Sequence, residues 1–133
     1  MRITEATVVE VVREASGKMA DPNYSAVMVG GFVQTQGPAA QYISAHASDL
    51  GGPEGVVNTI FHAALIALCF QRANRRTVRG IRFDELDHVA SGDREAALRD
   101  QQPAVLEYIE ANVELPAMKQ VLVLLALAME LVS

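Results

Sequence analysis

Aromatic residues are scarce in this chain of 133 residues, which contains no tryptophan, four phenylalanines and three tyrosines. Its core must therefore be built from aliphatic side chains, and two of these, Ala and Leu, favour helices. The single cysteine, Cys69, cannot form an internal disulfide, which excludes a disulfide-stapled secreted fold. Because Cys69 lies within the apolar run of residues 63–70, we expect a small, buried and unreactive side chain there.

Basic charge is also in short supply, because 11 Lys and Arg residues face 16 Asp and Glu residues and the formal net charge is −5. This balance argues against broad affinity for nucleic acid or anionic membranes. Glu5, Glu10 and Glu14 occupy the region where an export signal needs an apolar stretch. The apolar run between Lys119 and Glu130 is less than half of the roughly 20 residues that span a bilayer. We therefore expect a cytoplasmic protein that binds neither membranes nor nucleic acid.

Common catalytic and cofactor motifs are missing as well. The chain has no Cys-x-x-Cys, His-Glu-x-x-His or Gly-x-Ser-x-Gly sequence, and no nucleotide-binding loop of the Walker or dinucleotide type. Glu85 and His88 have the Glu-x-x-His spacing of di-iron bundles, but such sites need this pair twice and two further glutamates. We therefore predict no cofactor and no metal site.

Two apolar segments, residues 63–70 and 121–129, are the clearest positive signal in the sequence. A helix that is apolar on every side must be surrounded by other helices or by a partner chain. The first segment belongs to a helix predicted over about 53–73, and the second to one predicted over 116–132. We predict an all-α fold in which residues 1–133 form one domain, a compact bundle of six or seven helices around these two central apolar helices.

Helix-start signals and apolar spacing place the other helices. Asp21 followed by Pro22 is a strong start, and Asp84 and Asp93 are the predicted N-caps of two short helices. Helices are predicted over 4–19, 22–36, 38–49, 84–90 and 94–101, and from 103 onward. Residues 75–82 break the helical pattern, and their apolar residues allow a short extended segment near 77–83.

Gly30 and Gly31 are unusual, because they fall inside the predicted helix over 22–36. An interior glycine costs about 1 kcal/mol relative to alanine. The pair therefore indicates either a bend or the close approach of another helix.

The apolar supply suggests that the protein works by association. Two apolar helices and several amphipathic ones are more than one small domain readily encloses, and a second copy would cover the excess. The leading hypothesis is therefore a non-enzymatic interaction or regulatory module that acts as a homodimer. The first and last helices are the ones expected to meet across the two-fold axis.

An alternative hypothesis is a small-molecule or metal-dependent enzyme. Its candidate catalytic residues are His62, which lies in an otherwise apolar helix, together with Glu85 and His88. Asn58 lies one helical turn before His62, and Tyr42 could face it from the preceding helix. This hypothesis predicts a pocket between helices that holds at least two of these side chains.

A second alternative is an adaptor that binds an acidic or phosphorylated protein. Five of the nine arginines lie between residues 72 and 82, and guanidinium groups bind carboxylate and phosphate well. The candidate binding residues are Arg75, Arg76, Arg79 and Arg82, with Arg72 at the edge of the segment. The ordinary explanation is that these arginines pair with the acidic helices that follow or are solvated.

Overall fold

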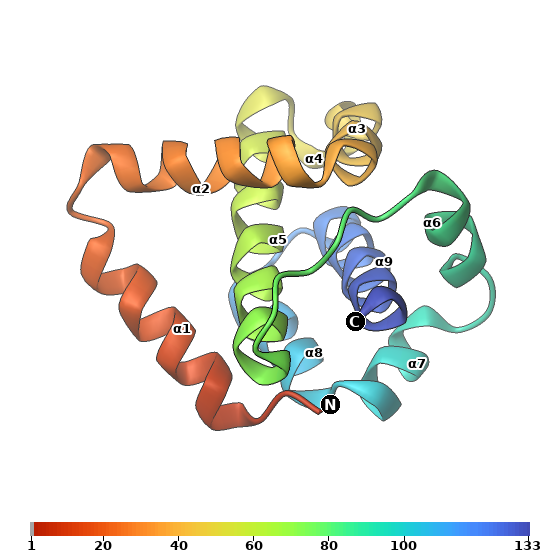
Figure 1. Ribbon diagram of the computed structural model, residues 1–133. Helices are drawn as coiled ribbons and strands as arrows, with labels where there is room; N and C mark the ends of the chain where they lie inside the picture. The colour runs from red at the N-terminus through yellow and green to blue at the C-terminus, as the bar shows by residue number, and fades with distance from the viewer. Residues whose placement is uncertain (1) are drawn as a thin grey trace.

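The computed structural model describes residues 2–133, and within them it contains nine helices and no strand (Figure 1). The prediction of an all-α fold is confirmed. The helices are α1 (Glu5–Lys18), α2 (Pro22–Thr35), α3 (Gly37–Ala45), α4 (Ala47–Leu50), α5 (Pro53–Asn74), α6 (Phe83–Val89), α7 (Arg94–Gln101), α8 (Pro103–Asn112) and α9 (Pro116–Val132). The count exceeds the predicted six or seven partly because the predicted helix over 38–49 is interrupted at His46.

The helix starts follow the capping residues in most places. The side-chain oxygen of Thr4 accepts a hydrogen bond from the Thr7 amide at 3.1 Å. Asp21 accepts one from the Asn23 amide at 2.9 Å, and Asp93 accepts one from the Ala96 amide at 3.1 Å. These bonds satisfy amides that the first helical turn leaves without partners.

The prediction that Asp84 caps the short helix α6 is wrong. The N-cap is Arg82, and the Glu85 carboxylate reaches back to accept a hydrogen bond from the Arg82 amide at 2.9 Å. Asp84 lies inside the first turn and pairs with the Arg82 guanidinium at 3.1 Å. Glu85 therefore takes the capping role that was predicted for Asp84, because its longer side chain can fold back over the start of the helix.

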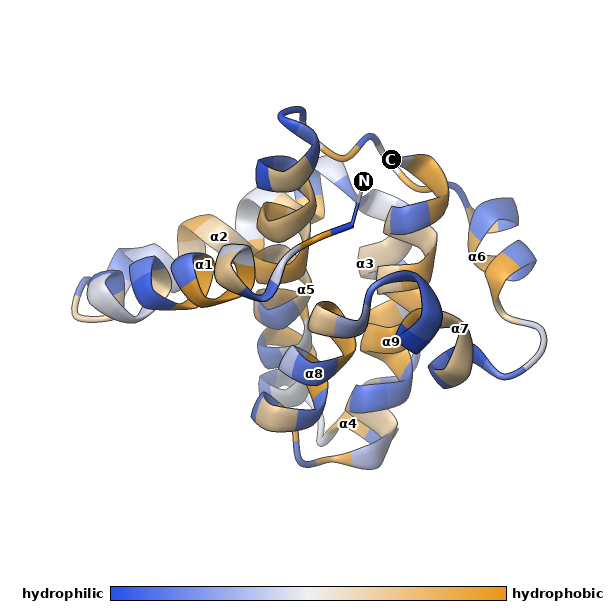
Figure 2. Ribbon diagram, turned by 90° about the horizontal axis from the view of Figure 1, so that it is seen from below, coloured by the Kyte–Doolittle hydropathy of each residue, from blue (hydrophilic) through white to orange (hydrophobic). Residues whose placement is uncertain are grey.

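Helix α9 is enclosed by the chain itself. Every residue from Val121 to Met129 is buried, and α9 contacts α4, α5, α6, α7 and α8. Figure 2 shows its hydrophobic residues in the middle of the molecule. Because its own chain covers it, this stretch of α9 offers no apolar face for the two-fold contact proposed from the sequence.

Helix α5 stands beside α9 and also contacts α1, α2, α3 and α4 (Figure 1). By length and composition it is the one helix in residues 2–133 that could cross a membrane, and 44% of its most apolar window is buried. A core helix of a soluble protein passes the same test, so this match is weak evidence by itself.

A buried glutamine holds the segment between α5 and α6. The side-chain amide of Gln36 donates to the carbonyl of Arg79 at 2.8 Å and accepts from the amide of Ile81 at 2.9 Å. Residues 77–82 have no regular secondary structure, so this side chain supplies the hydrogen bonds that a neighbouring strand would otherwise provide. The segment is thereby fixed against the start of α3.

A second buried glutamine fixes the beginning of the described chain in the same way. The Gln102 side chain accepts from the Ile3 amide at 2.8 Å and donates to the Glu130 carboxylate at 2.8 Å. Gln36 and Gln102 each follow one helix and precede the next, α3 and α8 respectively. Both junctions therefore use a side-chain amide to fasten a distant segment.

Candidate functional site

His62 is the sequence-predicted candidate with the most distinctive surroundings. Its Nδ1 atom lies 2.8 Å from the hydroxyl of Tyr108, a buried residue of α8. Burial lowers the pKa of His62, and it raises the pKa of Tyr108. The imidazole is therefore held neutral, with one nitrogen engaged by the phenol. No local pattern in the sequence points to Tyr108 as the partner of His62, because it lies 46 positions further along the chain.

A cavity of about 460 Å³ adjoins His62 where the end of α1 and the start of α2 approach α5. Asn58 and Phe61 of α5 and Ser25 of α2 also line it. Of the residues named in the enzyme hypothesis, only His62 and Asn58 line this cavity, and both belong to α5, one helical turn apart. The three candidate catalytic residues His62, Glu85 and His88 are not brought together.

Glu85 and His88 do not line this cavity. The Glu85 carboxylate is buried and bound by the Arg79 guanidinium, with Nη1 of the arginine 3.0 Å from Oε1, and by the Arg82 amide. These bonds lower the pKa of Glu85 to about 2, so it is charged and occupied near neutral pH. His88 is exposed on α6. Within residues 2–133, no group of three or more His, Cys, Asp or Glu side chains could hold a metal ion.

Tyr42 contacts another histidine instead of His62. Its ring lies 4.5 Å from that of His46, centroid to centroid, and Nδ1 of His46 lies 2.8 Å from the Tyr42 carbonyl oxygen. This contact lies within the stretch from α3 to its C-cap, and neither residue lines the His62 cavity.

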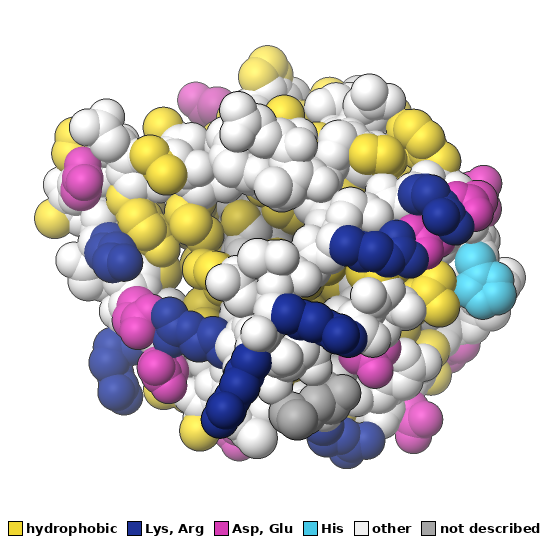
Figure 3. Space-filling model, in the orientation of Figure 1, with side chains coloured by type: hydrophobic (Ala, Val, Ile, Leu, Met, Phe, Trp, Pro, Cys, Tyr) yellow, Lys and Arg dark blue, Asp and Glu magenta, His cyan; other side chains and the backbone are white. Residues whose placement is uncertain are grey.

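The arginine segment is largely neutralised by the chain's own carboxylates. Arg72 pairs with Glu10 and Glu14 of α1, and these bonds raise its pKa. Arg79 and Arg82 pair with the first turn of α6. Figure 3 shows Lys and Arg side chains with Asp and Glu side chains beside them on this face. Arg72 therefore links α5 to α1, and Arg79 and Arg82 link the segment to the start of α6.

Arg75 and Arg76 are the two members of the segment without an ion pair in the described chain. Both are exposed, and Arg75 ends α5 in the left-handed conformation with φ of 57°. Of the four candidate binding residues of the adaptor hypothesis, Arg79 and Arg82 are paired with carboxylates of the chain, and Arg75 and Arg76 are the two that remain.

The outer face of α2 is the most unusual surface of the molecule. Of its 14 residues only Phe32 is buried, and no Asp, Glu, Lys or Arg occurs between Asp21 and Asp49. Val27 is 69% exposed and Val33 is 43% exposed. Figure 3 shows hydrophobic side chains gathered in the region of α1 and α2.

Gly30 and Gly31 lie on this exposed helix, and a Cβ atom added at either would meet nothing within 4 Å. The fold of the single chain therefore does not require glycine at these positions. An apolar groove of about 360 Å³, lined by Val27 and Gly31 but not by Gly30, runs between α2, α5 and residues 77–78, and no charged residue lines it. Together the helix face and the groove form a continuous uncharged surface, which we call the α2 face.

No protein-family model, curated protein or solved structure matches this chain.

Proposed function

We propose that this protein is a non-enzymatic interaction or regulatory module that acts as a homodimer, and that the α2 face forms the contact. In each subunit α5 and α9 are the central apolar helices of the bundle. We also propose that the protein is cytoplasmic and binds neither nucleic acid nor membranes.

Gly30 and Gly31 are the main support for a contact at α2. Each glycine inside an exposed helix costs about 1 kcal/mol relative to alanine, and no neighbouring atom of residues 2–133 offsets this cost. A helix of a second subunit that crosses α2 at Gly30 would offset it, because backbones can approach closely only where side chains are absent. The sequence indicates either a bend or the close approach of another helix at these glycines. We assign the close approach to a helix of a partner copy.

The absence of charge selects a second copy as that partner. In a two-fold contact the same surface meets itself, so any charge near the axis meets a like charge. The α2 face has no charged residue to repel its copy. Val27 and Val33, which flank the glycines, would lose their exposed apolar area on dimerisation, and this loss stabilises the pair.

The test is the molar mass in solution, measured by size-exclusion chromatography with light scattering at micromolar concentrations. The unmodified protein is expected to be a dimer. Val27→Asp should give a folded monomer, because it places two carboxylates near each other across the axis. Leu131→Asp, at a residue of α9 that is 46% exposed, is the matched control and should remain dimeric. A monomeric unmodified protein, or a Val27→Asp variant that stays dimeric, contradicts the proposal.

A second candidate function, a small-molecule enzyme, is supported by one observation, the cavity shared by His62 and Asn58. Glu85 is excluded from a general-base role there because Arg79 occupies it. A screen of small molecules by thermal shift, with His62→Gln as the comparison, tests this candidate. A ligand that stabilises the unmodified protein and not the variant would support it, and the absence of any such ligand would count against it.

A further inference from the structure

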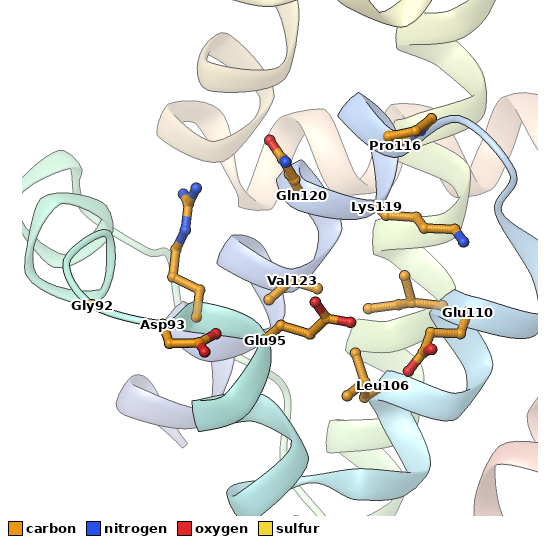
Figure 4. A pocket seen from close by; sticks show the side chains of 11 residues that line it. Gly92, Asp93, Glu95, Leu106, Glu110, Pro116, Lys119, Gln120 and Val123 are labelled. Atoms are coloured by element: carbon orange, nitrogen blue, oxygen red, sulfur yellow. The ribbon is translucent and has the colours of Figure 1, made fainter.

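A cleft of about 350 Å³ between α7, α8 and α9 has charges of both signs around it (Figure 4). Its charged residues are Asp93, Arg94, Glu95, Glu110 and Lys119. No ion pair joins any two of them in the described chain, so this mixture favours no particular ligand. The cavity beside His62 is different, because a hydrogen bond to α8 fixes the orientation of that side chain.

The two ring nitrogens of His62 have different surroundings. Nδ1 lies 2.8 Å from the Tyr108 hydroxyl, and this is the one hydrogen bond of that hydroxyl within residues 2–133. If the hydroxyl accepted the bond, its own proton would have no acceptor among those residues. The phenol therefore donates to Nδ1, and the ring proton is on Nε2. Burial lowers the pKa of His62 and raises the pKa of Tyr108, so the ring is neutral and the phenol keeps its proton.

The Nε2 edge of the His62 ring faces the cavity. Nε2 has no hydrogen-bond partner within residues 2–133, and no fully buried side-chain nitrogen or oxygen atom there lacks one, so Nε2 is accessible. His62 lines the cavity and Tyr108 does not, so the ring edge away from the phenol is the one that reaches it. The cavity of about 460 Å³ therefore contains one oriented N–H donor.

The other residues of the lining limit what this donor can bind. Four of them are apolar: Met19, Pro53, Val57 and Phe61. Ser25 and Asn58 are polar and uncharged, and among the described residues of the lining Glu54, which is exposed, alone is charged. Neither a neutral imidazole nor a carboxylate attracts an anion, and an ammonium group cannot accept a hydrogen bond from Nε2–H. The partner that fits is an uncharged oxygen acceptor on an apolar body.

We propose that this cavity binds an uncharged carbonyl compound with an apolar body, whose oxygen accepts a hydrogen bond from Nε2–H of His62. Tyr108 is the positioning residue, because its hydroxyl determines which ring nitrogen carries the proton. In this state His62 polarises a carbonyl group as a donor and cannot act as a general base at Nε2. The inference rests on the second candidate function, the small-molecule site, and not on the homodimer.

The first experiment locates the ring proton by NMR of the ring nitrogens in the isotope-labelled full chain at neutral pH. The His62 signals are those lost in His62→Gln, and Nε2 should carry the proton. Tyr108→Phe should give a mixture of both protonated forms, because nothing then fixes Nδ1. Tyr42→Phe, at a tyrosine outside the cavity, is the control and should keep the His62 signals of the unmodified protein. A proton on Nδ1 of the unmodified protein overturns the proposal.

The second experiment measures binding of three probes by shift changes of the α5 backbone amides. Acetophenone has the carbonyl oxygen, ethylbenzene lacks it, and benzoate carries a negative charge. Acetophenone should bind about fivefold more tightly than ethylbenzene, the factor expected for one hydrogen bond, and benzoate should bind more weakly than acetophenone. Tyr108→Phe should reduce the preference for acetophenone over ethylbenzene, and Tyr42→Phe should preserve it. Circular dichroism checks that each variant is folded.

Two results of the binding experiment contradict the proposal: no shifts with acetophenone at millimolar concentration, or equally tight binding of ethylbenzene or benzoate. A ligand of another class that stabilises the unmodified protein and not His62→Gln would overturn this inference alone and would support the second candidate function. The absence of any such ligand would count against both.

Discussion

Single side chains hold this fold together at two junctions. Gln36 and Gln102 are both almost completely buried, and each uses the donor and the acceptor of one amide to fix backbone or side-chain groups far away in sequence. A residue of similar size without both functions leaves buried polar atoms without partners, which is costly.

We expect Gln36→Leu to lower the free energy of unfolding by about 2–4 kcal/mol, because the Ile81 amide and the carbonyls of Val78 and Arg79 lose their partner. Urea denaturation measures this change. Gln101→Leu, at an exposed position, is the control and should change stability by less than about 0.5 kcal/mol. Similar effects of the two substitutions would show that the Gln36 hydrogen bonds contribute little.

His62 and Glu85 should each lose their contribution to stability as the pH falls, in two different pH ranges. The folded-state pKa of His62 lies below its unfolded value of 6.5, so its stabilising contribution is complete above pH 6.5 and is lost as the pH falls through the folded-state pKa. The pKa of Glu85 falls from 4.5 to about 2, so its contribution is complete above pH 4.5 and is lost toward pH 2.

Urea denaturation at a series of pH values separates the two. His62→Gln should flatten the stability profile just below pH 6.5, and Glu85→Gln should flatten it between pH 4.5 and 2. His88→Gln, on the exposed side of α6, should leave both ranges as they are in the unmodified protein. A His62→Gln profile with the unmodified slope would mean that the imidazole is solvated in the folded state.

At the scale of elements, α2 has an exposed apolar face and a low helix propensity, because Gly30 and Gly31 lie in its interior. Gly30→Ala should therefore have two effects of opposite sign. It should stabilise the isolated subunit by about 1 kcal/mol through helix propensity, and it should weaken dimerisation at least about tenfold by adding a methyl group at the contact. Thermal denaturation of the Val27→Asp variant with and without Gly30→Ala measures the first effect. Sedimentation in the analytical ultracentrifuge measures the second.

Gly17→Ala is the matched control, because Gly17 also lies in an exposed helix with nothing within 4 Å of an added Cβ. It should stabilise the subunit by a similar or smaller amount and leave dimerisation unchanged. If Gly30→Ala behaves in the same way, the α2 face is not the contact.

The sequence predicts helices well and their surroundings less well. Local signals identify the starts at Asp21 and Asp93, because a cap and its amides lie within three residues. The His62–Tyr108 bond is invisible to such reasoning, since it depends on how α5 and α8 cross. Hydropathy also fails to rank exposure, because α2 and α9 are both apolar and only the packing of the other helices decides which of them is covered.

At the scale of the whole molecule, the apolar helix α9 is inside, and α2, which has no charged residue, is largely outside. Amide hydrogen exchange should reflect this division, because local opening is easiest where few contacts hold a helix. We expect α9 amides to exchange slowly at every protein concentration. Exchange of α2 amides should be fast in dilute solution and slow down as the concentration rises, because the dimer protects them. Exchange of α2 that is independent of concentration would argue against the contact.

The position of α9 also has a consequence for biosynthesis. The helix that α4, α5, α6, α7 and α8 all pack against is the last of the nine to be made. At about 5–20 residues per second the ribosome releases the earlier helices before their common support exists. The part of the interior that these helices share with α9 therefore cannot form until residues 116–132 have been synthesised.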